Sequence, residues 1–248
     1  MRLQNKVAIV TGAGSGFGEG IARRFAAEGA RVVLADINED AGRRVAAEIG
    51  DAALFVRADV SRDADVAALA QSAQTAFGGI DILINNAGYT HRNGPMLDVD
   101  EETFDRIYAV NVKSIYLGAR HVVPCMRTRG GGVILNVAST AGVRPRPGLT
   151  WYNGSKGAAI VLTKSMAVEL APEKIRVVAL NPVAGETGML HLFMGEDTPE
   201  KRRQFVSTVP LGRLSRPADI ANAALFLCSD EAEFLTGVCM EVDGGRCI

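Results

Sequence analysis

Residues 11–18 read Thr-Gly-Ala-Gly-Ser-Gly-Phe-Gly. This glycine-rich stretch follows the short apolar run Val7–Val10 and precedes Ile21–Ala27, a segment with the apolar spacing of a helix. Glycines lack a Cβ, so the backbone N–H groups of such a turn can approach a pyrophosphate at the positive end of a helix. The spacing is not the strict Gly-x-Gly-x-x-Gly pattern, which leaves a purely structural turn as the alternative. The strand before the turn and the helix after it favour nucleotide binding.

Short apolar runs alternate with helical segments along the rest of the chain. Further strands are predicted at Arg31–Ala35, Ala53–Val56, Ile82–Ile84, Val133–Val137, Ile175–Leu180 and Val238–Val242, and further helices at Val66–Phe77, Phe104–Met126, Ala158–Leu170 and Ile220–Leu227. Strands that are apolar throughout and alternate with helices are typical of a parallel sheet covered on both faces. We therefore predict one α/β domain over residues 1–248, a Rossmann-type doubly wound parallel sheet of about seven strands. The long irregular stretch 183–209 is predicted to be a substrate lid.

Composition excludes several classes of protein. Lys and Arg number 27 against 28 Asp and Glu, and they are dispersed, so the basic surface of a nucleic-acid binder is missing. No apolar run is long enough to cross a bilayer, and the first residues leave no room for a signal peptide. Four cysteines without Cys-x-x-Cys spacing favour neither a metal site nor disulfides. We expect a cytoplasmic protein that binds no nucleic acid, membrane or metal.

Polar residues recur where the predicted strands end. Asp36 ends the second strand, Asp59 and Val60 follow the third, and Asn85-Asn86-Ala87-Gly88 closes the fourth. Ligands of such sheets bind beyond the carboxyl ends of the strands, although each residue alone could be a turn or a helix cap. A carboxylate at Asp36 can bind the adenosine ribose and would repel a 2′-phosphate, and neither Ser15 nor Ile37 offers a cation. NAD(H) is therefore predicted in preference to NADP(H).

Tyr152 and Lys156 are four residues apart at the start of a helical pattern, so their side chains share one helix face. Tyrosine has an ordinary pKa of about 10 and needs a neighbouring cation to act as a base near neutral pH. Ser139, at the end of the fifth strand, could donate a hydrogen bond to a substrate oxygen, and Asn111 could hold a water that links Lys156 to solvent. Each of these residues taken singly is more often structural.

The ordered set of motifs resembles the short-chain dehydrogenase/reductase family over essentially the whole length. The resemblance rests on the Thr-Gly-x-x-x-Gly-x-Gly turn, the Asn-Asn-Ala-Gly segment, the serine and the Tyr-x-x-x-Lys pair. It implies a catalytic set of Asn111, Ser139, Tyr152 and Lys156. It also implies a cofactor site of Thr11, Gly12, Gly14, Ser15, Gly16, Phe17, Gly18, Asp36, Ile37, Asp59, Val60, Asn86, Ala87, Gly88, Tyr152, Lys156, Pro182, Val183 and Thr187. The family usually has Pro-Gly after the sixth strand, whereas this chain has Pro182-Val183, so the backbone path there is left open.

The resemblance implies an NAD(H)-dependent oxidoreductase that interconverts a secondary alcohol and a ketone, and it also implies a homotetramer. A 3-oxoacyl thioester reductase and a sugar dehydrogenase share the same motifs, and a non-catalytic nicotinamide-binding subunit is the alternative from another class. Apolar residues in the 183–209 stretch, among them Met189, Leu190, Leu192, Phe193 and Met194, favour a hydrophobic or aromatic substrate if they line the pocket, but they could equally pack structurally. Arg144 and Arg146 could meet an acidic substrate or simply be solvated.

Overall fold

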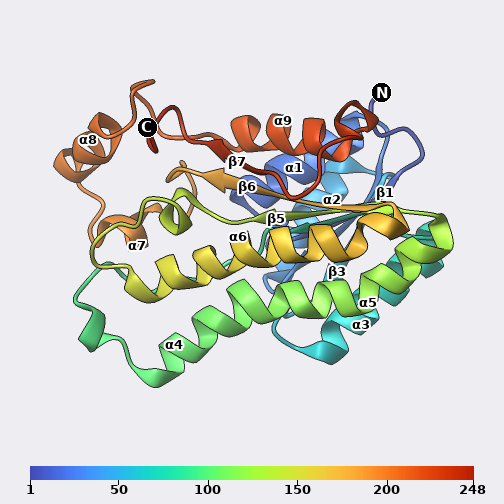
Figure 1. Ribbon diagram of the computed structural model, residues 1–248, viewed down its shortest axis with the longest axis horizontal. Helices are drawn as coiled ribbons and strands as arrows, with labels where there is room; N and C mark the ends of the chain where they lie inside the picture. Colours follow the sequence, from blue (N-terminus) through green and yellow to red (C-terminus); the bar gives the residue numbers. More distant parts are fainter.

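A single sheet of seven parallel strands runs through the middle of the molecule, with helices on both faces (Figure 1). The computed structural model describes residues 1–248. The strand order is β3-β2-β1-β4-β5-β6-β7, so the order reverses beside β1, between β1 and β4. The strands are β1 Val7–Thr11, β2 Arg31–Asp36, β3 Ala53–Arg57, β4 Ile82–Asn85, β5 Gly132–Val137, β6 Ile175–Pro182 and β7 Cys239–Val242. The predicted doubly wound α/β fold is confirmed.

Burial on both faces explains why the strands are apolar throughout. Neighbouring residues of one strand enter different cores: Val10 of β1 packs with α1 (Gly16–Ala27) and α9 (Pro217–Cys228), whereas Ile9 packs with the helices of the opposite face. The same division holds in β4, where Ile82 and Ile84 face one core and Leu83 the other. The two apolar cores therefore bury both faces of the sheet. Polar groups are found where the strands end.

Helices form one layer on each face. The first layer consists of α1 Gly16–Ala27, α2 Glu39–Ile49 and α9 Pro217–Cys228. The second consists of α3 Asp63–Phe77, α4 Glu101–Tyr108, α5 Ser114–Arg129 and α6 Thr150–Leu170. Two short helices, α7 Leu190–Met194 and α8 Pro199–Ser207, lie apart from these layers at one end of the molecule (Figure 1).

The structure differs from the predicted elements in two places. The predicted helix Phe104–Met126 is divided into α4 and α5 by a turn of π-helix at Ala109–Lys113, and Asn111 lies within that turn. Helix α2 was not predicted, because charged residues interrupt its apolar pattern and only Gly42 and Val45 are buried. The 183–209 segment does contain two helical patches, as the sequence indicates.

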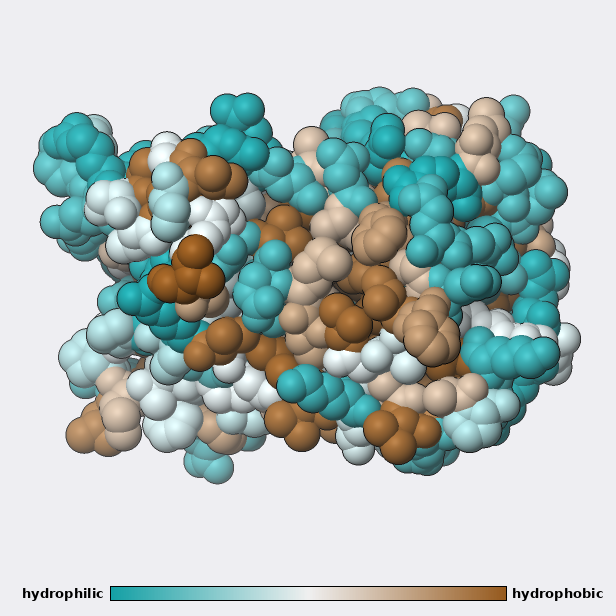
Figure 2. Space-filling view, turned by 45° about the horizontal axis from the view of Figure 1, so that its top comes forward, coloured by the Kyte–Doolittle hydropathy of each residue, from teal (hydrophilic) through white to brown (hydrophobic).

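The surface combines charged and apolar regions. Figure 2 shows hydrophobic residues gathered toward the middle of one face and hydrophilic residues around them. None of the helices is both long enough and apolar enough to cross a membrane.

Candidate active site

A cavity of about 440 Å³ lies at the carboxyl ends of the strands and collects residues from the loops after β1, β2, β3, β4, β5 and β6. All but four of the predicted site residues line it. The four that do not are Thr11, Gly14, Gly18 and Asn111. Each of these four supports a residue that does line the cavity, as the contacts below show.

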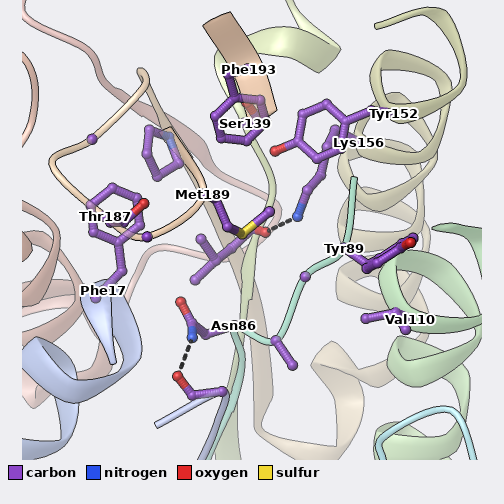
Figure 3. A pocket seen from close by; sticks show the side chains of 18 of the residues that line it. Phe17, Asn86, Tyr89, Val110, Ser139, Tyr152, Lys156, Thr187, Met189 and Phe193 are labelled. Carbon is purple, nitrogen blue, oxygen red and sulfur yellow. Dashed lines mark hydrogen bonds between the residues drawn. The ribbon is translucent and has the colours of Figure 1, made fainter. Parts of the chain in front are cut away.

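The glycine turn is locked to the end of β4 by hydrogen bonds. The Thr11 Oγ1 accepts from the backbone N–H groups of Asn86 (2.9 Å) and Ala87 (3.0 Å). The Asn86 side-chain amide in return donates to the carbonyl oxygens of Thr11 (2.8 Å) and Gly12 (3.2 Å) (Figure 3). Gly12 adopts φ +64°, a conformation that favours glycine, and a Cβ there would lie 2.9 Å from the Ala87 Cα. The turn therefore holds a fixed shape beside β4.

The turn delivers the N-terminus of α1 to the cavity. Gly16 also has a positive φ of +57°, and Ser15, the N-cap residue, makes no side-chain hydrogen bond to the helix. The first N–H groups of a helix have no partner within it and carry a partial positive charge, which suits a pyrophosphate. The turn packs closely on α1, and its glycines have no side chains that would keep a pyrophosphate from the N-terminus of the helix. This geometry fits a dinucleotide.

Asp36 lies at the end of β2 and faces the glycine turn. Its carboxylate accepts from the N–H of Gly14 at 2.8 Å and from the N–H of Asn38 at 2.9 Å. The N-cap of α2 is Asn38, whose side chain accepts from Ala41, so the alternative that Asp36 is the helix cap is wrong. The carboxylate lines the cavity and is positioned from two sides, as a ribose-binding group requires.

Asp59 is paired with an arginine that the sequence did not reveal. Arg106 of α4 donates to the Asp59 carboxylate at 3.2 Å, and the Ser61 hydroxyl donates to it at 2.6 Å. Burial raises the pKa of Asp59, but the hydrogen bonds from Ser61 and Arg106 outweigh it and hold that pKa below its ordinary value. Arg106 and Asp59 both line the cavity, at the end of β3.

Tyr152 and Lys156 lie on one face of α6 and are both buried. Figure 3 shows the phenol hydroxyl and the amine pointing into the same cavity. The Lys156 Nζ donates to the carbonyl of Val137 at 2.8 Å and lies 5.8 Å from the centroid of the Tyr152 ring. The prediction that the two side chains share one face is confirmed. The structure also gives Lys156 an anchor at the end of β5.

Burial disfavours the charged forms of both the Tyr152 phenol and the Lys156 amine. It raises the pKa of Tyr152 to about 12, a rise that the neighbouring Ser139 hydroxyl partly opposes. It lowers the pKa of Lys156 to about 8. The sequence predicts that Lys156 and an oxidised nicotinamide together lower the phenol pKa, and in the protein without coenzyme desolvation has the larger effect. The phenol therefore carries its proton at neutral pH and is ready to donate it.

Replacing Lys156 by methionine should stabilise the protein while removing activity. A lysine whose pKa is lowered on folding binds fewer protons folded than unfolded, so its cost to stability is fully present below pH 8 and disappears above its ordinary pKa of 10.5. After allowing for the lost bond to Val137, we expect a gain of about 2 kcal/mol at pH 7. Thermal unfolding of both proteins from pH 7 to 10 measures it. If the gain in the free energy of unfolding does not shrink as the pH rises, the lowered pKa of Lys156 is not its cause.

Ser139 and Asn111 support the pair in different ways. Ser139 lines the cavity, and its Oγ also accepts from the N–H of Ala141 at 3.0 Å, which fixes the start of the following turn. Asn111 is buried, accepts from the Tyr89 N–H at 2.8 Å, and donates to the Tyr89 carbonyl and the Ser155 hydroxyl, both at 2.9 Å. These contacts place Asn111 behind the cavity wall, where it positions Tyr89.

The apolar residues of the 183–209 segment divide between two roles. Met189 and Phe193 line the cavity, and the Phe193 ring lies 5.3 Å from the Tyr152 ring (Figure 3). Leu190 and Met194 instead pack with Leu214 in a small core. An apolar wall next to Tyr152 is thus present, but only part of the predicted set forms it.

Other residues near the site lie where the sequence could not place them. Trp151 faces away from the cavity and donates to the Met96 carbonyl at 3.0 Å. The lining residues that sequence reasoning missed as cofactor or catalytic candidates include Tyr89, Arg106, Val110, Arg146, Leu149 and Phe205. Tyr89 directly follows the Asn-Asn-Ala-Gly segment, which is the one sequence signal that could have found it.

A glycine turn leads into a helix at the carboxyl ends of the parallel strands, and it shares a cavity with a buried Tyr-Lys pair. This combination defines a dinucleotide-dependent oxidoreductase. Residues 12–246 match the family model for enoyl-(acyl carrier protein) reductases, and the chain belongs to the short-chain dehydrogenase/reductase family. It is 53% identical over 99% of both chains to 4-formylbenzenesulfonate dehydrogenase of Comamonas testosteroni. It is 41% identical to the 7alpha-hydroxysteroid dehydrogenase of Escherichia coli K12, covering 99% of this chain and 95% of that one.

A solved structure is equally similar in sequence. The 3-ketoacyl-(acyl-carrier-protein) reductase of Brucella melitensis, complexed with NADH, superposes with a TM-score of 0.95 at 53% identity. The match covers 99% of this chain and 100% of that chain. The fold and the oxidoreductase class are therefore shared with characterised family members.

Proposed function

We propose that this protein is an NAD(H)-dependent oxidoreductase that interconverts a secondary alcohol and a ketone, with a hydrophobic or aromatic substrate. The observation that carries the proposal is the placement of the Tyr152 hydroxyl and the Lys156 amine in the same cavity as the glycine turn and Asp36. When bound, the nicotinamide supplies or accepts the hydride.

The residues of the chain supply the proton and the surroundings for that exchange. In ketone reduction, the Tyr152 hydroxyl donates its proton to the substrate oxygen, and the Ser139 hydroxyl donates a hydrogen bond to the same oxygen. Lys156, held by the Val137 carbonyl, stabilises the phenolate that remains. In alcohol oxidation the proton moves the other way. Met189 and Phe193 keep water from the reacting oxygen, and we propose that the 183–209 segment acts as a substrate lid.

Two relatives support a substrate with an aromatic or hydrophobic body, because their names specify an aromatic aldehyde that also carries a sulfonate and a steroid alcohol. The similar reductase from Brucella melitensis is named for a 3-ketoacyl thioester, which makes a 3-oxoacyl thioester the second candidate. A coenzyme absorbance assay with aryl ketones, secondary alcohols, an acetoacetyl thioester and a free sugar separates these candidates. We expect turnover of aryl ketones. Binding of NADH with no turnover of any compound would instead support a non-catalytic nicotinamide-binding subunit.

The carboxylate of Asp36 supports a preference for NAD(H) over NADP(H). Replacing Asp36 by alanine removes a charged acceptor for the ribose hydroxyls, so we expect the KM for NAD to rise about 10- to 100-fold. The KM for NADP should fall, because the repulsion of the 2′-phosphate is lost. Asp40→Ala removes the same charge from the exposed start of α2 and should leave both constants nearly unchanged. A wild-type preference for NADP would overturn the role given to Asp36.

We also propose that the protein is a cytoplasmic homotetramer. The supporting observation is that apolar side chains on the outer face of α6 are exposed in the single chain, namely Val161 (66%) and Val168 (80%). Burying such a face favours association. Light scattering coupled to size-exclusion chromatography measures the assembled mass, and a monomeric mass would rule out the tetramer.

A further inference from the structure

Three arginines, none of them paired with an Asp or Glu side chain, lie beside the cavity. Arg146 lines the cavity in the loop between β5 and α6, and Arg144 and Arg246 are close enough to act on its charge. None of the three forms an ion pair, whereas Arg106 is paired with Asp59 and Arg213 with Asp219. No Asp or Glu side chain is therefore paired with the positive charge of Arg146 at this side of the cavity.

The guanidinium of Arg146 is held in place by the 183–209 segment. Its Cζ lies 4.4 Å from the centroid of the Phe205 ring, and its Nη2 donates to the Thr208 hydroxyl at 3.4 Å. The Arg146 carbonyl accepts from the Asn153 side chain at 2.8 Å, which ties the loop to α6 one residue after Tyr152. The cation is thus fixed relative to the catalytic helix, and most of its donors remain free.

The surroundings make this charge costly. Burial, followed by the charges of Arg246 and Arg144, lowers the pKa of Arg146 to about 10. The Nε of Arg246 is buried and has no hydrogen-bond partner. Arg144 is exposed and donates to the Arg246 carbonyl at 2.7 Å and to an oxygen of Ile248 at 3.4 Å. Arg146 and Arg246 are half-buried, and no Asp or Glu side chain forms an ion pair with either, so an anion that binds Arg146 would offset the cost of desolvating its charge.

We propose that Arg146 forms a subsite for a negatively charged group on the substrate, a carboxylate or a sulfonate. Phe193 at Tyr152 and Phe205 at Arg146 line the same cavity, so an apolar or aromatic body fits between the reacting carbonyl and the anion. The planar guanidinium matches the oxygens of either acid with paired hydrogen bonds. The inference rests on the proposed function and narrows its substrate to acidic carbonyl compounds.

The test compares three ketones of similar shape with NADH: 4-acetylbenzoate, 4-acetylbenzenesulfonate and the neutral 4-methylacetophenone. The wild type should favour both acids over the neutral ketone. In Arg146→Gln, kcat/KM for the acids should fall about 100-fold, mainly through KM. The value for the neutral ketone should stay within about threefold, and the KM for NADH should not change. An increased KM for NADH would assign the arginine to a coenzyme phosphate instead.

Two further variants separate charge recognition from a structural role. Arg146→Lys keeps the charge and should restore part of the lost affinity for the acids. Arg203→Gln makes the matched change on the exposed face of α8, where the arginine is paired with Glu200, and should have little effect on any substrate. If Arg146→Gln lowers turnover of the neutral ketone as much as that of the acids, Arg146 only holds the lid and the inference is wrong.

Binding of 4-acetylbenzoate to the NADH-loaded protein, measured by calorimetry, distinguishes this inference from the proposed function. Turnover of all three ketones without preference for the acids would leave the proposed function standing and overturn the anion subsite. No turnover, combined with binding that is lost in Arg146→Gln, would overturn the proposed function and leave the subsite standing.

Discussion

Replacing Tyr152 by phenylalanine should lower kcat by about 1000-fold or more, while the Kd for NADH changes less than about twofold. The ring is buried against Phe193, and phenylalanine preserves that packing, so only the hydroxyl is lost. Without that hydroxyl the substrate oxygen loses its proton donor, and Ser139 is left to supply only a hydrogen bond. Steady-state kinetics with an accepted ketone, together with a fluorescence titration of NADH, measure both quantities.

Tyr116→Phe is the matched control for this variant. Tyr116 is exposed on α5, and its hydroxyl only accepts from Arg120, so the same chemical change there should leave kcat unaltered. A Tyr152→Phe variant with near-normal kcat would remove the phenol from the mechanism. Loss of NADH binding together with activity would instead indicate that the tyrosine is needed to form the site.

Replacing Gly18 by alanine should disrupt the coenzyme site by pushing α1 away from the glycine turn. A Cβ on Gly18 would lie 2.1 Å from the carbonyl oxygen of Gly12 and 2.5 Å from the Asn86 side chain, so α1 and the glycine turn must separate. We expect NADH to bind at least tenfold more weakly and the free energy of unfolding to fall by about 3 kcal/mol. Calorimetric titration and chemical denaturation measure the two effects.

Gly157→Ala provides the corresponding control in another helix. Gly157 lies in α6, and an added Cβ would meet nothing within 4 Å. The substitution should be neutral or should stabilise the protein by up to about 1 kcal/mol, because alanine is the better helix former. A Gly18→Ala variant that behaves like Gly157→Ala would show that the close contact between α1 and the turn is not needed.

The fold could be predicted because its deciding signals are local. Each buried strand is apolar throughout, each helix of the main layers except α2 has a recognisable apolar spacing, and the glycine turn marks the β1–α1 junction. The π-helical turn at Asn111 escaped prediction because it shifts the helical period by one residue, and its side-chain partners, the Tyr89 backbone and Ser155, come from distant segments.

The site could be predicted only where its residues come in motifs. Tyr152 and Lys156 are four residues apart in one helix, so sequence spacing alone places them together. Arg106 forms a hydrogen bond with Asp59, which is 47 residues away in the sequence. Arg146 packs its guanidinium on the ring of Phe205, which belongs to the 183–209 segment. Such pairs depend on how loops fold back on the sheet, which no local pattern records. The raised pKa of Tyr152 in the protein without coenzyme likewise depends on how deeply the phenol is buried, which the motif does not record.

The most direct test of the proposed chemistry follows the hydride itself. NADH carrying deuterium at the transferred C4 position is mixed with 4-acetylbenzoate and the wild-type protein, and the product alcohol is analysed by mass spectrometry. We expect one deuterium per molecule of alcohol, bonded to the former carbonyl carbon. The rate of alcohol formation should be strongly reduced in Tyr152→Phe. An enzyme that binds labelled NADH but leaves no deuterium in any ketone or thioester of the panel would contradict the proposed function.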